Sequence, residues 1–180
     1  RTPAAFADAR AVVRRSGFGQ TRVFELFRQH YHATPADLLV RARLDAAKQR
    51  LLTTRAGLAE IAGDVGFESL SVFHEQFRQR NGLTPAAYRD LAEERTFAVT
   101  LPDGYPLGYL RRALSRDIHS ANERLTGDDY VGAVQLTTGP ALLSLQLSPT
   151  TVQAEISAGS GVEAHALVIG LLGLDQDAAA

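Results

Sequence analysis

Two stretches of the chain share one pattern of apolar, polar and turn-forming residues. In the later one, residues 66–89 (GFESLSVFHEQFRQRNGLTPAAYR), Phe73 and Phe77 are four positions apart, so both rings lie on one face of a predicted helix. Ser69 precedes this helix as a predicted N-cap. Gly82 follows it, where a left-handed C-cap is expected. The opposite helix face carries polar side chains.

The earlier stretch, residues 17–38, repeats this pattern (GFGQTRVFELFRQHYHATPADL). Two tripeptides recur at an offset of 50, and the Gly-Phe pair recurs at an offset of 49: Phe27-Arg28-Gln29 with Phe77-Arg78-Gln79, Thr34-Pro35-Ala36 with Thr84-Pro85-Ala86, and Gly17-Phe18 with Gly66-Phe67. Each Thr-Pro pair predicts an N-cap and the first residue of a further helix. A duplicated, capped segment is far less expected by chance than a single one.

Helical spacing of apolar residues predicts further helices on both sides of these repeats. The first is expected to start at Pro3, with Thr2 as N-cap, and to continue to about Ser16. A short helix over GLAEIAGDVG precedes the second repeat, so each repeat has helix-turn-helix spacing. The long helix that starts at Pro35 is interpreted as a connector between the repeats; the alternative is an ordinary bundle helix.

The pattern changes at Arg95 from helical spacing to alternation. Strands are predicted at residues 96–101, 121–126, 130–136, 141–147 and 151–156, and helices at 106–114 and 162–172. This order predicts an antiparallel sheet with two helices on one face. The expected fold is therefore two domains: an all-α double helix-turn-helix domain at residues 1–94 and an α+β antiparallel-sheet domain at 95–180.

Charge divides the chain in the same way. Residues 1–95 carry 15 Lys and Arg against 11 Asp and Glu, whereas residues 96–180 carry 4 against 9. The net charges of +4 and −5 suggest different partners for the halves. An ordinary soluble helical domain could also have +4, so the charge supports nucleic-acid binding only together with the duplication.

Several residue types and segments are missing from the chain. It has no Cys, which excludes disulfides and cysteine-ligated zinc and is compatible with a reducing cytoplasm. No apolar run approaches the roughly 18 residues of a membrane span, and no signal peptide is visible. The chain also has no Met and begins with Arg, so we expect a fragment or processed product with further domains upstream and downstream.

Two polar helix faces are the candidate DNA-binding surfaces, because Gln and Arg can contact adenine and guanine edges, Glu can accept from cytosine, and Ser and Thr can contact phosphates. The alternative interpretation is that these faces are ordinary solvent-exposed helix surfaces, which are polar in most proteins. Arg22 is the favoured base contact, and the equivalent positions of Arg28 and Arg78 favour a phosphate or packing role. The candidates are Gln20, Thr21, Arg22, Glu25 and Arg28 on the first helix, and Ser69, Leu70, Ser71, His74, Glu75 and Arg78 on the second.

Other candidate chemistry is sparse. His30 and His32 do not face each other on a helix, so a solvated helix end is favoured over a metal site. Asp128 and Asp129 follow Gly127 and indicate a turn. No nucleophile elbow or phosphate loop is present. We therefore expect no catalytic residues, metal or cofactor in this chain.

Residues 3–91 resemble the DNA-binding region of the AraC/XylS family of transcription regulators. The matching residues are Ala46-Ala47-Lys48-Gln49-Arg50-Leu51-Leu52, Ile61-Ala62, Val65-Gly66-Phe67, Ser71, Phe73, Phe77-Arg78, Gly82-Leu83-Thr84-Pro85 and Tyr88-Arg89. The resemblance implies two helix-turn-helix units joined by one long helix. Each recognition helix would enter a major groove, about one turn of duplex apart.

Most of residues 95–177 resembles the N-terminal domain of the 3-methyladenine DNA glycosylase II family. The residues that carry the resemblance are Phe97, Val99, Leu101-Pro102, Tyr105-Pro106, Tyr109-Leu110, Leu114, Arg116-Asp117, Glu123-Arg124, Asp129-Tyr130 and Leu171-Leu172-Gly173-Leu174-Asp175. In that family the domain is an accessory to a catalytic domain that follows it. Any glycosylase activity would therefore lie downstream.

The combination resembles alkylation-response regulators related to Ada, although the cysteine-zinc methyl acceptor of that group is absent here. The resemblance implies sequence-specific binding of double-stranded DNA and transcription regulation in the alkylation-damage response. RNA polymerase is the implied further partner, with a cytoplasmic, nucleoid-associated location. The alternatives are the accessory DNA-binding part of a DNA-3-methyladenine glycosylase, which leaves enzymatic activity of the parent protein open, and a regulator whose second domain senses a ligand.

Overall fold

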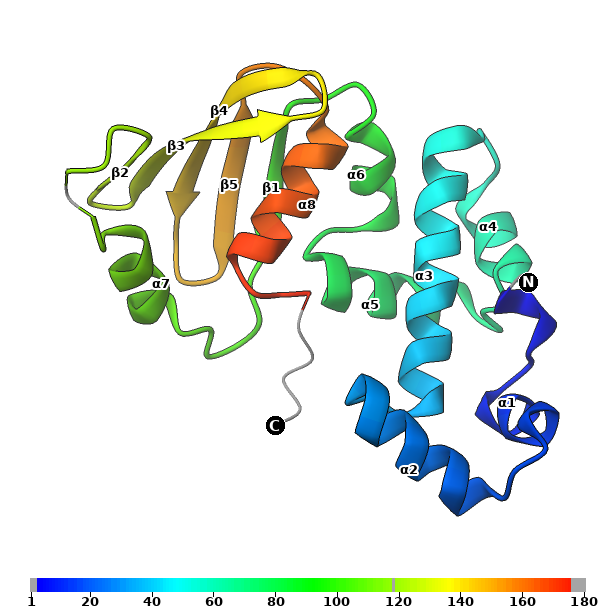
Figure 1. Ribbon diagram of the computed structural model, residues 1–180. Coiled ribbons are helices and arrows are strands. Elements are labelled where there is room, and N and C mark those ends of the chain that lie inside the picture. The colour runs from blue at the N-terminus through cyan, green and yellow to red at the C-terminus, as the bar shows by residue number, and fades with distance from the viewer. Residues whose placement is uncertain (1–2, 118, 176–180) are drawn as a thin grey trace. The chain divides into compact units, whose positions relative to one another are not determined.

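The computed structural model describes residues 3–117 and 119–175, which form a helical region followed by a region with a five-stranded sheet (Figure 1). The chain separates into two compact units, residues 3–77 and 78–175, with the division inside α5. The helical elements before the sheet are η1 (Pro3–Ala5), α1 (Ala9–Ser16), α2 (Gln20–Tyr31), α3 (Pro35–Thr53), α4 (Leu58–Asp64), α5 (Leu70–Asn81) and α6 (Pro85–Asp90).

The long helix α3 is the centre of the first unit, where it contacts η1, α1, α2 and α4. Near its middle, Arg43 donates hydrogen bonds to the carbonyl oxygens of Phe6 (2.7 Å) and Ala7 (3.0 Å). The same guanidinium lies 5.9 Å from the centre of the Phe67 ring. One side chain of α3 therefore binds both the N-terminal segment and the turn of the second repeat.

The predicted first helix is wrong at its start. Residues Pro3–Ala5 form a single 3₁₀ turn, and the α-helix begins only at Ala9. Asp8 has extended backbone angles and its carboxylate accepts from the N–H of Ala11 at 2.7 Å, so it is the N-cap. An acidic cap satisfies an otherwise unpaired N–H and interacts favourably with the helix dipole. The predicted cap, Thr2, lies outside the described residues.

The repeats have the same local structure. Helices α2 and α5 each have 12 residues and begin 50 positions apart. Both are followed by a residue in the left-handed region, His32 at φ 51° and Gly82 at φ 67°. Both are then followed by a threonine N-cap and a proline in the first turn of the next helix. The predicted caps Ser69, Thr34 and Thr84 and the predicted left-handed Gly82 are confirmed, whereas no left-handed residue was predicted at His32.

The second region contains a five-stranded antiparallel sheet in the order β1-β5-β4-β3-β2. Burial alternates along its strands, so the buried side chains lie on one face. Helix α8 contacts β1 and β5, and α7 contacts β2 (Figure 1). The predicted elements are confirmed as β1 (Thr96–Thr100), α7 (Leu107–Leu114), β2 (Glu123–Thr126), β3 (Asp129–Leu136), β4 (Gly139–Leu147), β5 (Thr151–Ile156) and α8 (Gly161–Leu171).

The end of α5 is part of the core of this second unit. The buried His165 of α8 donates from Nε2 to the carbonyl oxygen of Asn81 at 2.8 Å. The N–H of Thr100 donates to the carbonyl oxygen of Gly82 at 2.6 Å. A Cβ at Gly82 would lie 2.4 Å from a methyl carbon of Val99, so only glycine fits against β1 here. Carbonyls at a helix C-terminus need partners, and α8 and β1 supply them.

The start of α8 lies equally close to the segment after α6. A Cβ at Gly161 would lie 2.2 Å from the carbonyl oxygen of Glu94. The His165 ring stands edge-on to Tyr88 of α6, with 5.5 Å between ring centres, and 5.6 Å from Phe97 of β1. The last helix of the second repeat is therefore packed into the sheet unit.

Candidate nucleic-acid interface

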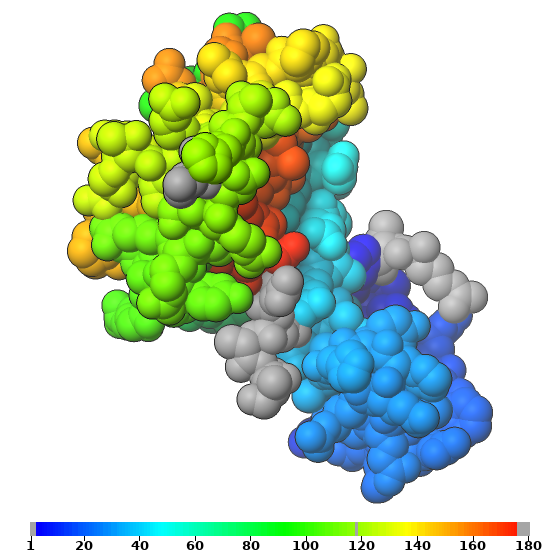
Figure 2. Space-filling view, turned by 60° about the vertical axis from the view of Figure 1, so that its left-hand side comes forward, coloured from blue at the N-terminus to red at the C-terminus, as the bar shows by residue number. Residues whose placement is uncertain are grey.

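The outer face of α2 carries the five candidates of the first repeat. Val23 is buried and Phe27 half-buried on the inner face, whereas Gln20, Thr21, Arg22, Glu25 and Arg28 are all exposed. Arg22 and Glu25 form an ion pair at 3.8 Å, with both side chains 62% exposed. Such an exposed pair contributes about 0–1 kcal/mol, so the Arg22 guanidinium can exchange this partner for another at little cost. Figure 2 shows the surface of this segment in blue on the near side.

The second repeat has a more tightly packed inner face. The side chains of Phe73 and Phe77 are fully buried, and their ring centres lie 5.7 Å apart. Phe67 adds a third ring, 5.3 Å from Phe73. Aromatic rings in tilted contact at these distances stabilise beyond their area alone. The aromatic cluster therefore fixes which face of α5 is available to solvent.

The candidates on α5 are less uniform in exposure. Leu70, Ser71, Glu75 and Arg78 are exposed, whereas Ser69 and His74 are half-buried. The His74 ring lies edge-on to Phe73 with 5.9 Å between centres, so it flanks the aromatic cluster. The Ser69 hydroxyl accepts from the N–H of Val72 at 3.4 Å, which confirms it as the N-cap.

Sequence reasoning left out three exposed residues on the same two faces. Val72 is 53% exposed, and Gln29 and Gln79 are exposed at equivalent positions of the repeats. A helical projection centred opposite Phe73 and Phe77 would have selected Val72 and Gln79, because each successive residue turns by about 100°. Val72 was not selected, although the equally apolar Leu70 was among the candidates.

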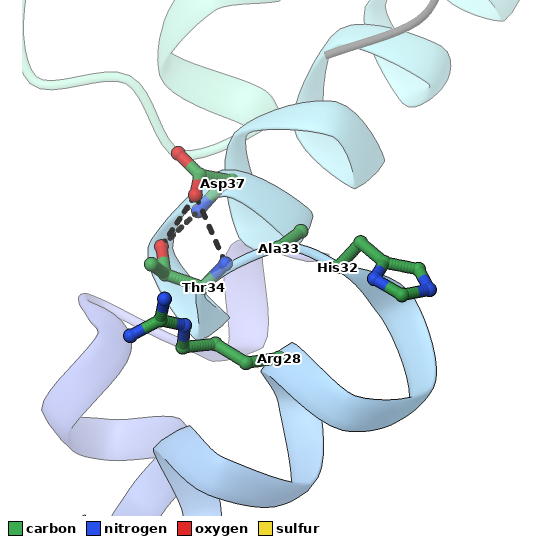
Figure 3. A pocket seen from close by; sticks show the side chains of 5 residues that line it. All are labelled: Arg28, His32, Ala33, Thr34 and Asp37. Carbon is green, nitrogen blue, oxygen red and sulfur yellow. Dashed lines mark hydrogen bonds between the residues drawn. The ribbon is translucent and has the colours of Figure 1, made fainter. Parts of the chain in front are cut away.

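A hollow of about 360 Å³ lies where α2 meets α3, lined by Arg28, His32, Ala33, Thr34 and Asp37 (Figure 3). In that view Arg28 extends toward Thr34, and the His32 ring points to the other side. The Thr34 N–H donates to the Asp37 carboxylate at 3.0 Å, and the Asp37 N–H donates to the Thr34 hydroxyl at 3.2 Å. These reciprocal bonds are a capping box.

The helices that begin at Pro35 and Pro85 differ in the groups that occupy their first N–H donors. At Pro35 a carboxylate already interacts with the N–H groups and dipole of α3, so an anion is disfavoured there. At Pro85 the Thr84 hydroxyl accepts from Ala87 at 3.2 Å and no carboxylate takes part. In the hollow, Arg28 therefore remains the group best suited to a phosphate contact.

Several titratable side chains outside the two helix faces have partners within the fold. On α3, burial lowers the pKa of Lys48, and Asp45 at 3.8 Å partly opposes the shift. In the sheet unit, burial raises the pKa of Tyr130 to about 12, and its hydrogen bond to Glu123 acts in the same direction. Asp128, in the predicted turn, pairs with Arg111.

Residues 3–117 and 119–175 contain neither a metal-binding cluster nor a membrane-spanning helix. No group of three or more His, Asp or Glu side chains in this part of the chain is arranged to hold a metal ion. Over the same residues, no helix is both long and apolar enough to span a bilayer.

Comparison with known proteins places the similarity in the first half of the chain. Residues 12–90 match the family described as "Helix-turn-helix domain". The raffinose operon transcriptional regulatory protein RafR of Pediococcus pentosaceus is 36% identical over 67 residues, which cover 37% of this chain and 24% of RafR. The regulatory protein SoxS of Escherichia coli K12 is 33% identical over 78 residues, or 43% of this chain and 73% of SoxS.

Among solved structures, the C-terminal domain of the two-component response regulator yesN from Fusobacterium nucleatum is 27% identical. The alignment covers 47% of this chain and 85% of that one, with a TM-score of 0.43. The chain spans about a quarter of the length of the first curated relatives it matches.

Proposed function

Because this chain belongs to the AraC/XylS type of helix-turn-helix DNA-binding proteins, we propose that it binds specific sequences of double-stranded DNA and regulates transcription. The similarity to SoxS, which extends over most of that protein, supports the assignment. The observation that carries it is the duplicated helix with an exposed polar outer face, present in α2 and again in α5. RNA polymerase is the partner that this role requires, and a cytoplasmic location follows from it.

We propose that the two repeats act as two helix-turn-helix units. In each, the helix before the turn would position the unit, and α2 or α5 would enter the major groove. Successive grooves on one side of a duplex are roughly 34–36 Å apart, so the expected site has two half-sites about one helical turn apart. Two half-sites of different sequence are expected, because the exposed residues of α2 and α5 differ.

The test is the affinity of the full chain for a duplex enriched from a random library, measured against salt concentration. Each phosphate contact contributes about −0.9 to the slope of log affinity against log salt. Arg28→Ala is expected to reduce the slope by about one, with similar loss on all sequences. Arg22→Ala should instead lose sequence discrimination, by about 1–3 kcal/mol at the base it contacts.

Arg124→Ala is the matched control, because Arg124 is an exposed arginine on β2 of the sheet. It should leave affinity and slope unchanged. The full chain is required, because truncation at residue 95 would remove Thr100 and His165, the hydrogen-bond partners of Gly82 and Asn81. If no sequence is enriched and binding has no salt dependence, the helical region is an interaction domain of another kind.

We further propose that the second region connects this regulator to the DNA alkylation-damage response. The support is the resemblance of residues 95–177 to the glycosylase II N-terminal domain, together with the sheet-and-two-helix architecture expected from it. In this proposal the sheet region is an accessory domain of the regulator.

Survival of the source organism under a methylating agent tests this second proposal. Loss of the gene should increase killing by the agent and should leave ultraviolet survival unchanged. Equal survival with and without the gene would contradict the alkylation role and leave the DNA-binding proposal intact. A thermal shift produced by a small metabolite and abolished by substitutions in the sheet would instead support a ligand-sensing domain.

A further inference from the structure

Helix α5 carries an apolar side chain on its outer face. Val72 is 53% exposed, whereas Phe73 and Phe77, which form the core side, are fully buried. At about 100° per residue, Val72 lies roughly 100° from Phe73 and roughly 140° from Phe77 around the helix. The Val72 side chain is therefore not part of the core, and it projects among the exposed residues Ser71 and Glu75.

Leu70 is 42% exposed but has a different position. It lies about 160° from Val72 around the helix and only about 20° from Phe77. Leu70 therefore borders the buried face, one turn before the aromatic cluster. Of the two exposed apolar residues in the first turn of α5, Val72 has the side chain directed outward.

The first repeat has hydrogen-bonding groups where the second has apolar ones. With α2 and α5 aligned at the offset of 50, Gln20 corresponds to Leu70 and Arg22 to Val72. Three exposed positions further along the two helices are identical: Glu25 and Glu75, Arg28 and Arg78, and Gln29 and Gln79. Among the exposed candidate positions, the copies therefore differ in the N-terminal turn, which is the part of a recognition helix that contacts base edges. The half-buried His74 is a further difference, since Phe24 is its counterpart in the first repeat.

Only one apolar group projects from the base edges into the major groove, and it is the 5-methyl group of thymine. A short branched side chain without a donor or acceptor cannot distinguish bases by hydrogen bonds. It can do so by burying a methyl group. We propose that Val72 selects thymine by contact with its 5-methyl group in the half-site bound by α5. This inference rests on the proposed DNA-binding function and assigns one base of the site.

The experiment replaces individual thymines of an enriched site by deoxyuridine, which lacks only the 5-methyl group. For the full chain, one or two replacements in one half-site are expected to reduce affinity about fourfold each, the effect of one buried methyl group. For the Val72→Ala variant, the same replacements should have no effect. Val72→Ala should bind the unmodified duplex as weakly as the original chain binds the deoxyuridine duplex.

Three variants serve as controls. Val131→Ala shortens a 41% exposed valine on β3 and should retain the deoxyuridine effect. Leu70→Ala should retain it also, because Leu70 faces away from Val72. Arg22→Ala should retain it while relaxing discrimination in the other half-site.

A deoxyuridine effect that persists in Val72→Ala would overturn the inference, as would an enriched site without a methyl-sensitive thymine. In both cases the enriched site itself still supports the proposed function. If no sequence is enriched, the proposed function and this inference fail together.

Discussion

The two repeats have the same length, caps and turn geometry, yet their surroundings differ. After α2, the left-handed residue is His32, which is exposed beside the hollow of the capping box. After α5, the equivalent residue is Gly82, which is buried against Val99 and hydrogen-bonded to β1. Of the described residues, His32 alone has a positive φ without being glycine.

The inner face of α5 is also more deeply buried than the inner face of α2. The inner face of α2 has one fully buried residue, Val23, and Phe27 is only half-buried. The inner face of α5 has two fully buried phenylalanines. Because stability depends on surface removed from water, one sequence pattern can give a firmly held helix and a loosely held one. The two repeats therefore share their local caps and turns, whereas the elements packed around each repeat determine how much it contributes to stability.

The largest expected difference concerns the equivalent phenylalanines. Phe77→Ala should reduce the free energy of unfolding by about 3–5 kcal/mol, because it leaves a cavity in a closed core. Phe27→Ala should cost about half as much, since solvent already reaches that ring. Urea unfolding of the full chain measures both. Equal losses would show that the two phenylalanines are packed alike in solution and would contradict the difference between the repeats.

The residues after the helices should respond in opposite ways. Gly82→Ala should cost about 2–4 kcal/mol, from the left-handed backbone and from a Cβ forced against Val99. His32→Gly should raise the free energy of unfolding by about 0.5–1 kcal/mol, because glycine adopts the left-handed backbone conformation at this exposed site without strain. Thermal unfolding should show a lower Tm for Gly82→Ala and a higher Tm for His32→Gly than for the original chain.

A double variant separates the two causes at Gly82. Adding Val99→Ala to Gly82→Ala should remove the contact and recover part of the loss, relative to Val99→Ala alone. An absence of coupling would assign the whole effect to the backbone.

The hydrogen bond from His165 to Asn81 has no counterpart in the first repeat. His165→Phe keeps a ring between Tyr88 and Phe97 but removes the donor, and should cost about 1–3 kcal/mol. Amide hydrogen exchange should rise at the C-terminal end of α5 and remain the same in α2. His119→Phe, at an exposed position, is the matched control and should change stability by less than about 0.5 kcal/mol. Faster exchange in both helices would contradict a role confined to the second repeat.

The smallest difference concerns the threonine caps. Thr34→Ala should cost about 1 kcal/mol, because it breaks both bonds of the capping box with Asp37. Thr84→Ala should cost about half of that, since it breaks one bond to Ala87 on a six-residue helix. Urea unfolding followed by circular dichroism measures both losses in the free energy of unfolding. A larger loss for Thr84→Ala than for Thr34→Ala would contradict the order expected from the caps.

Sequence alone predicted most elements because their signals are local. The caps Ser69, Thr34 and Thr84 lie next to the helices they start, and the alternation of β1 to β5 follows from the period of two along a strand. The candidate interface was predicted in the same way, from polar residues at helical spacing. Val72 was left out although the same helical spacing places it on the exposed side of α5.

The sequence by itself determined the duplication, most helix and strand positions and the polar outer faces of α2 and α5. All of these depend on interactions between residues a few positions apart. Only the tertiary structure decided that α1 begins at Ala9, after the N-cap Asp8, that the sheet order is β1-β5-β4-β3-β2, and that Gly82 and Asn81 bond to β1 and α8. The contacts of Gly82 and Asn81 join residues 18 and 84 positions apart, which no local pattern encodes.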